Sequence, residues 1–167
     1  GIVRDFDRDL RFFAWLAGWA NCFTAAKRLR LPEMVATLKD SVALELDLRL
    51  EAASASELRE NLAGDSDITI PSAHWETTTR CVLTMDRLRG IPIDHVEELK
   101  AAGQDPRRIV NVAARTFFTQ VFRDGFFHAD LHPGNLFVLP NGAIGVVDFG
   151  IMGRLDFKNR LFLAEVL

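Results

Sequence analysis

The chain has 167 residues, of which 49% are hydrophobic and 26% are charged, a composition typical of a folded globular domain with one core. Its formal net charge is −3 and its basic residues are spread along the chain, which argues against a nucleic-acid-binding surface and against disorder. Cys22 and Cys81 stand far apart without a metal-ligand spacing, which predicts two free thiols in a reducing compartment.

The first part of the sequence predicts two consecutive helices, over residues 5–30 and 32–62, with a proline at the start of the second. The second is unusually long. The apolar run 12–20 is shorter than the roughly 20 residues that cross a bilayer, so no membrane span is expected. Trp15 and Trp19 could lie at a membrane interface, but burial against their own domain is the favoured interpretation.

Strands and shorter helices are predicted for the rest of the chain. In chain order these are neighbouring strands over 68–70 and 80–88, helices over 93–102 and 106–127, and a hairpin formed by 136–139 and 143–147. The hairpin is the clearest element, because Asn141-Gly142 can supply the positive φ angles of a tight turn. We expect one compact unit, with a small strand-containing part over 1–89 and a helical part over 90–167.

The residues with an evident chemistry lie in FHADLHPGNLFVLPNGAIGVVDFG, residues 127–150. In kinase-type phosphoryl transfer an Asp accepts the proton of the attacking hydroxyl, an Asn five residues later binds Mg²⁺, and the Asp of a DFG sequence binds Mg²⁺ between the phosphates. Asp130, Asn135 and Asp148 have this spacing, with His128 two residues before the first of them. The stretch therefore predicts a catalytic loop with a magnesium site.

The ligand types agree with that interpretation, because Mg²⁺ prefers carboxylate and amide oxygens together with phosphate oxygens. Each residue alone could simply stabilise a turn, since Asp and Asn are favoured there. A rival reading takes His128 and His132, four apart, as ligands of a metallohydrolase. Pro133-Gly134 argues against the helix that this reading needs, and it leaves Asn135 and the DFG sequence unexplained.

A second group of carboxylates, Glu45, Asp47 and Glu51, falls on the predicted long helix. Glu51 lies within an apolar stripe, and a carboxylate that faces a core needs a partner. In a kinase this partner is the Lys of the third strand, which positions the ATP phosphates. No lysine of this chain stands in such a strand, so we expect Glu51 to be underpaired here. A solvated acidic helix face is the alternative.

These stretches occur together in one known family. They are ELDLRLEAASASELREN from residue 45, MDRLRGIPI from residue 85, FFTQVFRDGFFHADLHPGNLFV from residue 117, and DFGIMGRL from residue 148. The combination resembles the UbiB family of atypical protein-kinase-like proteins, the aarF-domain-containing kinases linked to ubiquinone biosynthesis. The resemblance implies a truncated α+β protein-kinase-like fold, because the KxGQ segment, the Ala-rich loop and the strand lysine of the family would precede Gly1.

The resemblance also implies roles for individual residues. Asp130 would be catalytic with His128 and Glu51 beside it, Asn135 and Asp148 would bind the metal, and Glu45, Asp47, Met85, Asp86 and Leu88 would contact the nucleotide. Met85 to Leu88 would form the hinge beside the adenine. ATP and Mg²⁺ are the implied cofactors, and the isolated chain is expected to be inactive.

The implied function is an ATPase or unorthodox kinase activity that supports ubiquinone biosynthesis. Quinone-like lipids and other ubiquinone-biosynthesis proteins are the implied partners, without nucleic acid, at the cytoplasmic side of a membrane that segments outside this chain would contact. Two alternatives remain open: a small-molecule phosphotransferase of the aminoglycoside or choline kinase type, and a scaffold that senses nucleotide without turnover.

Overall fold

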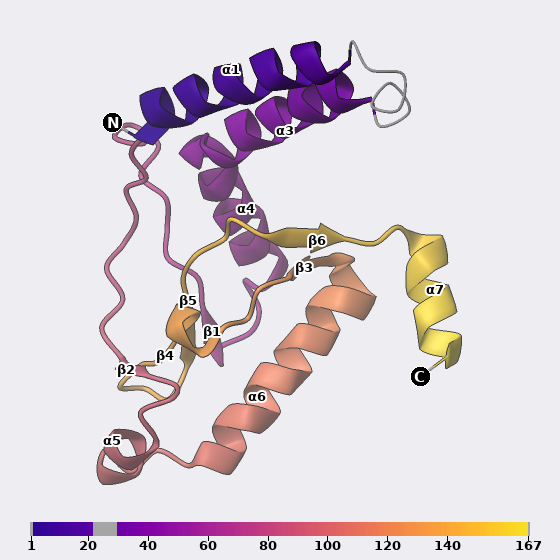
Figure 1. Cartoon of the computed structure of the whole chain (residues 1–167). Coiled ribbons are helices and arrows are strands. Elements are labelled where there is room, and N and C mark those ends of the chain that lie inside the picture. Colours follow the sequence, from indigo (N-terminus) through magenta and orange to yellow (C-terminus); the bar gives the residue numbers. More distant parts are fainter. Residues whose placement is uncertain (1, 22–29, 167) are drawn as a thin grey trace. The chain divides into compact units, whose positions relative to one another are not determined.

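The computed structural model describes residues 2–21 and 30–166, and the chain divides into two compact units, residues 1–47 and 48–167. The first unit contains α1 (Ile2–Ala20) and α3 (Leu31–Glu45), which lie side by side (Figure 1). Leu10 and Ala17, two turns apart on α1, are buried. Burial of the α1 tryptophans was wrongly predicted, because Trp15 and Trp19 are 65% and 60% exposed in this structure.

The long helix predicted over 32–62 is wrong, because it is two helices. α3 ends at Glu45, and α4 (Leu48–Asn61) begins after a break at Leu46 and Asp47. Both sides of the break have good helix formers, and the sequence there contains neither Gly nor Pro. The backbone N–H of Leu48 instead donates to the carbonyl of Arg80, a contact between distant segments that periodicity does not predict.

The second unit is built on a four-stranded sheet and a two-stranded sheet, with α4 and α6 packed around them (Figure 1). Its elements after α4 are β1 (Ile68–Thr69), β2 (Ile91–Pro92), α5 (Val96–Ala101), α6 (Pro106–Phe118), the π-helix η1 (Thr119–Asp124), β3 (Phe126–His128), the 3-10 turn η2 (Pro133–Asn135), β4 (Leu136–Val138), β5 (Ile144–Val146), β6 (Met152–Arg154) and α7 (Phe157–Val166). The first sheet has the order β1-β5-β4-β2, and β3 pairs with β6 in the second.

One hydrophobic core joins these elements. Its buried members are Ala55, Leu58, Leu62, Ile70, Leu99, Ile109, Val112, Phe126, Leu136, Val138, Ile144, Val146 and Phe149. The apolar stripe predicted around Glu51 is confirmed at Ala55 and Leu58 of α4, which are buried, and Ile109 of α6 is buried as well. Burial of a Leu or Ile side chain stabilises a fold by about 1.5–3 kcal/mol. None of the described helices combines the length and apolar character required to span a membrane.

The predicted hairpin is confirmed, with β4 and β5 antiparallel and Leu136 opposite Val146. Its turn differs from the expected two-residue type. Only Gly142 has a positive φ, of 82°, while the side chain of Asn141 accepts a hydrogen bond from the N–H of Ala143. A three-residue loop with glycine in the left-handed position is the next most common hairpin connection.

The strand predicted over 80–88 is wrong. This segment makes isolated bridges, Ala73 with Met85 and Thr79 with Val82, and no continuous ladder in the described part of the chain. Its β-branched and apolar residues favour extended backbone, but a strand also requires a neighbour along its length. The helix predicted over 106–127 ends earlier, because η1 and the left-handed Gly125 turn the chain into β3.

Gly153 on β6 lies directly opposite Phe127 on β3, and an added Cβ would overlap the Phe127 ring. We therefore expect Gly153→Ala to lower the free energy of unfolding of the complete protein by about 1–3 kcal/mol, as overpacking does. Urea unfolding would measure this. Gly64→Ala is the matched control, because its Cβ would meet nothing within 4 Å; equal stability of the two variants would contradict the clash.

Candidate catalytic loop and metal site

His128 forms the buried centre of the predicted catalytic loop. It is the last residue of β3 and is 1% exposed. The centroid of its ring lies 6.0 Å from the centroid of the Phe149 ring. Its Nδ1 accepts the backbone N–H of Asp130 at 3.2 Å, and its Nε2 contacts the backbone carbonyl oxygen of Asp148. A carbonyl oxygen only accepts, so Nε2 carries the proton and the ring is in its neutral Nε2–H form. One side chain thus joins the loop to the DFG sequence.

Strand pairing brings the three candidate residues to the same region. In the β4–β5 hairpin, the N–H of Val147 donates to the carbonyl of Asn135 at 2.9 Å, so Asp148 follows the residue opposite Asn135. In the β3–β6 pair, the N–H of Ala129 donates to the carbonyl of Ile151 at 3.0 Å. Extending this register places Asp130 opposite Gly150. Both ladders therefore end at the DFG sequence.

Asp148 has a backbone conformation that is uncommon for a residue other than glycine, with φ of 64°. Its side chain is exposed, and its Oδ1 accepts the N–H of Gly150 at 3.2 Å. Asp tolerates this region better than most residues because its short polar side chain bonds locally. Such conformations concentrate at functional sites, where the surrounding contacts hold them in place.

Asn135 is oriented with its amide nitrogen toward the protein. Nδ2 donates to the carbonyl of Asp130 at 3.4 Å, so the amide oxygen is the atom left for an external partner. This oxygen and the exposed Asp148 carboxylate are ligands of the type that Mg²⁺ takes. Among the described residues, no three His, Cys, Asp or Glu side chains form a metal site by themselves. The donor set fits a cation that phosphate oxygens also coordinate.

The 3-10 turn η2, which carries Asn135, is stabilised by contacts with neighbouring residues. Pro133 begins η2, and the Nδ1 atom of His132 accepts the N–H of Gly134 at 3.1 Å. His132 is therefore the N-cap of this turn and is exposed. Its ring nitrogen is used in capping, and no described contact pairs it with His128 in a metal site. The geometry favours the kinase reading over the metallohydrolase reading.

The predicted nucleotide contacts lie in two different parts of the chain. Glu45 ends α3 and Asp47 lies in the break, both within the first compact unit, so their role stays a prediction. In the hinge segment, Met85 packs against the core and Asp86 is exposed. The side chain of Leu88 lies close to Gly145 of β5, where an added Cβ would come within 2.8 Å of its Cδ1.

Asp86 has a partner that the sequence did not predict. Its carboxylate is 2.9 Å from the Nε2 of His74 and accepts the N–H of Ser72 at 3.3 Å. The N–H of Asp86 in turn donates to the carbonyl of Ser72 at 3.0 Å. These contacts hold the hinge segment against residues 72–74.

Comparison with known proteins identifies the family. The sequence matches the profile of the ABC1 atypical kinase-like domain over residues 1–167. The chain belongs to this family. Because the ABC1 family is that of the UbiB and aarF proteins, the predicted resemblance is confirmed, and so is the kinase-like fold of mixed helix and sheet.

A solved structure is similar to this ABC1 chain. It is described as the complex of Rv3197 with erythromycin from Mycobacterium tuberculosis, with a TM-score of 0.55 and 25% sequence identity. The match covers 72% of this chain and 30% of that chain. The ABC1 chain therefore corresponds to less than a third of the length of that protein.

Glu51 of the ABC1 chain is half-buried on α4, and its Oε1 accepts the backbone N–H of Phe149 at 3.1 Å. Glu51 thus has a partner in the DFG backbone, whereas its pairing with a lysine stays a prediction. A carboxylate has two oxygens that each accept more than one hydrogen bond, so this contact leaves capacity for a lysine as well. Glu51 links α4 directly to the DFG sequence.

We expect Glu51→Gln in the complete protein to weaken MgATP binding or turnover by about tenfold or more, because it removes the charge that would pair with the predicted lysine. The amide oxygen of Gln can still accept the Phe149 N–H, so Glu51→Ala should lose more. Glu60 on the same helix is the matched control. Calorimetric titration and phosphate release would measure both variants, and equal effects of Glu51→Gln and Glu60→Gln would remove the ion-pair assignment.

Glu57, the other glutamate of this helix, is unsuitable as a neutral control. Its carboxylate forms a double hydrogen bond with Arg154 of β6, one arm of which is 2.8 Å. The Arg154 guanidinium also lies 4.3 Å from the centroid of the Phe126 ring. Hydrogen bonding to Glu57 raises the pKa of Arg154 above its ordinary value. The pair fastens α4 to β6, which follows the DFG sequence.

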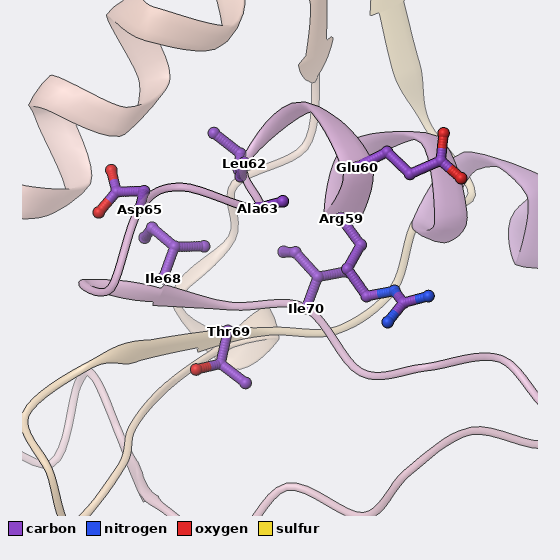
Figure 2. A pocket seen from close by; sticks show the side chains of 8 residues that line it. All are labelled: Arg59, Glu60, Leu62, Ala63, Asp65, Ile68, Thr69 and Ile70. Atoms are coloured by element: carbon purple, nitrogen blue, oxygen red, sulfur yellow. The ribbon is translucent and has the colours of Figure 1, made fainter.

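One pocket among the described residues lies apart from the candidate site. It has a volume of about 450 Å³ and is lined by Arg59, Glu60, Leu62, Ala63, Asp65, Ile68, Thr69 and Ile70. Figure 2 shows these side chains along the end of α4, the following turn and β1. None of the catalytic-loop or DFG residues lines it. The chemistry of the motif residues, and not the size of a cavity, therefore identifies the candidate site.

Proposed function

We propose that this chain is the catalytic-loop part of an ATP-dependent phosphotransferase or ATPase that uses Mg²⁺. The observation that carries the proposal is the connection made by His128, which ties the backbone of Asp130 to that of Asp148. A loop of turn-forming residues needs no buried histidine shared with a second motif. A catalytic loop does, because its acid-base and metal-binding groups must be held in a fixed relation.

The roles follow from the exposure and contacts of each side chain. Asp148 and the amide oxygen of Asn135 would hold Mg²⁺, which when bound neutralises charge on the phosphate oxygens. Asp130 is exposed, so its carboxylate can be reached by the attacking hydroxyl or water, whose proton it accepts. The His128 ring is buried and already bonded on both nitrogens, so it serves to position the loop and does not transfer a proton.

Within the ABC1 family, the wider role that we propose is support of ubiquinone biosynthesis, with quinone-like lipids and other biosynthetic proteins as partners at the cytoplasmic side of a membrane. The complete protein, purified and mixed with ATP, should release phosphate only when Mg²⁺ is present. Vesicles that contain a quinone-like lipid should raise the rate. Nucleotide binding without any turnover would support the scaffold alternative, and absence of Mg²⁺-dependent nucleotide binding in calorimetry would contradict the proposal.

A small-molecule phosphotransferase is the second candidate. The observation in its favour is that the similar protein Rv3197 is described in complex with erythromycin. The same assay, with erythromycin in place of the lipid and mass spectrometry of the product, distinguishes the two candidates. A phosphorylated macrolide would support the second, whereas an unmodified macrolide with lipid-stimulated phosphate release would support the first.

A further inference from the structure

Gln120 is a buried polar residue that the roles above do not use. It is 3% exposed, and the other buried polar side chains among the described residues are Thr116, one turn earlier, and His128. Gln120 continues the face of α6 that buries Ile109 and Val112 in the core. A primary amide placed on such a face lowers stability unless its polar atoms are hydrogen-bonded.

The partner of Gln120 is the catalytic loop. Its Oε1 accepts the backbone N–H of His128 at 3.0 Å. This N–H has no acceptor in the strand pair, because hydrogen-bonded and non-hydrogen-bonded positions alternate along an antiparallel ladder. Ala129 bonds across to Ile151, so the N–H of its neighbour His128 points away from β6. On the edge of β3 that does not face β6, the side chain of Gln120 therefore accepts the hydrogen bond that a neighbouring strand would otherwise accept.

The local backbone brings Gln120 and His128 together although they are eight residues apart. Gln120 is the second residue of η1, and π-helical turns are rare and frequent near functional sites. Gly125 then reverses the chain with φ of 66° and leads directly into β3. An added Cβ at Gly125 would collide with the carbonyl of Leu155, so only glycine fits this return. Figure 1 shows the upper, C-terminal end of α6 leading into β3.

We propose that Gln120 is a positioning residue for phosphoryl transfer, acting through His128. Holding the His128 N–H fixes the start of the loop, and the His128 ring then fixes the N–H of Asp130 and the carbonyl of Asp148. Hydrogen bonds thus run from the Gln120 side chain to His128 and from the His128 ring to the backbone N–H of Asp130, the residue that carries the proposed catalytic carboxylate. This inference rests on the proposed function, because positioning has a kinetic meaning only where Asp130 takes part in turnover.

The test uses the complete protein. Gln120→Met has nearly the same shape but no acceptor, and it should lower kcat for MgATP by about 10–100-fold while KM changes by less than about threefold. Gln120→Glu keeps an acceptor oxygen and should restore kcat to within about fivefold of the parent. Thr116→Val is the control, since it removes a buried hydroxyl from the same face without touching His128, and should leave kcat unchanged.

A structural readout accompanies the kinetics. Backbone hydrogen exchange, measured by mass spectrometry on a peptide that covers residues 126–130, should become faster in Gln120→Met and remain at the parent rate in Gln120→Glu and Thr116→Val. If Gln120→Met does not fold, Gln120→Asn is the second variant, because its oxygen is withdrawn by one carbon and the same fall in kcat is expected.

The outcomes separate this inference from the proposed function. A parent that turns over MgATP, with Gln120→Met equal to it in kcat and in exchange, would overturn the role of Gln120 and leave phosphoryl transfer standing. An equal loss in Thr116→Val would also overturn it, since the effect would then belong to the buried face as a whole. A parent without turnover would overturn the proposed function, and the role of Gln120 with it.

Discussion

Replacing Asp130 by Asn in the complete protein should lower the turnover of MgATP by about 10²–10⁴-fold, the usual contribution of a general base. Nucleotide affinity should change little, because the structure gives Asp130 no part in the candidate metal site beyond its backbone carbonyl, which Asn135 contacts. The backbone contacts of residue 130 do not depend on its side chain, so the loop should keep its conformation. Phosphate release beside calorimetric titration would measure both quantities.

His132 offers a matched control for this experiment. It lies in the same loop, is exposed, and has a local capping role. His132→Asn keeps a polar cap at the start of η2 and should change turnover by less than about tenfold. A turnover loss at Asp130 no greater than that at His132 would contradict the general-base role.

Replacing Asp148 by Asn should weaken the binding of Mg²⁺-nucleotide by at least about tenfold. Mutation of a residue that only hydrogen-bonds to a metal ligand typically lowers metal affinity 10–100-fold, and Asp148 is proposed as a ligand itself. Asn is well suited to the backbone here, since it tolerates positive φ and its side-chain oxygen can still accept the N–H of Gly150. The variant therefore removes charge and little else. The affinity for nucleotide without Mg²⁺ should be almost unchanged, and titrations with and without the metal would show the difference. Parent-like Mg²⁺-nucleotide affinity in Asp148→Asn would contradict the metal assignment and the kinase-like mechanism with it.

Local sequence signals predicted the hairpin and the apolar stripe of α4 well. The β4–β5 pair follows from two short apolar runs around Asn141-Gly142, and α6 begins where Asp105 caps it and Pro106 opens it. Two of the failures concern contacts between distant segments. The break at Leu46 and Asp47 and the lack of a ladder over 80–88 depend on which partner reaches the backbone, and residue preferences carry no such information.

The candidate site shows the same division. The spacing of Asp130, Asn135 and Asp148 predicted a shared chemistry. In the structure the β3–β6 and β4–β5 pairs both end beside the DFG sequence. How these residues are supported was not predictable in the same way. Glu51 accepts the N–H of Phe149, a residue 98 positions later in the sequence. In the sequence alone, Gln120 is a polar residue among apolar ones, and nothing there indicates that it is buried and hydrogen-bonded.

The turn of the β4–β5 hairpin, at Gly142, determines where a tag or label can be inserted into this protein. Arg108 of α6 donates to the carbonyl of Gly142 in the turn at 3.0 Å and to the carboxylate of Asp67 at 2.7 Å. Hairpin turns at the surface are usually good places for an inserted tag or label. Here a longer turn would release Arg108 from a hairpin that is also joined to residue 148 at its opposite end. A fluorophore is better attached at position 64, where a Cβ added to Gly64 would meet nothing within 4 Å.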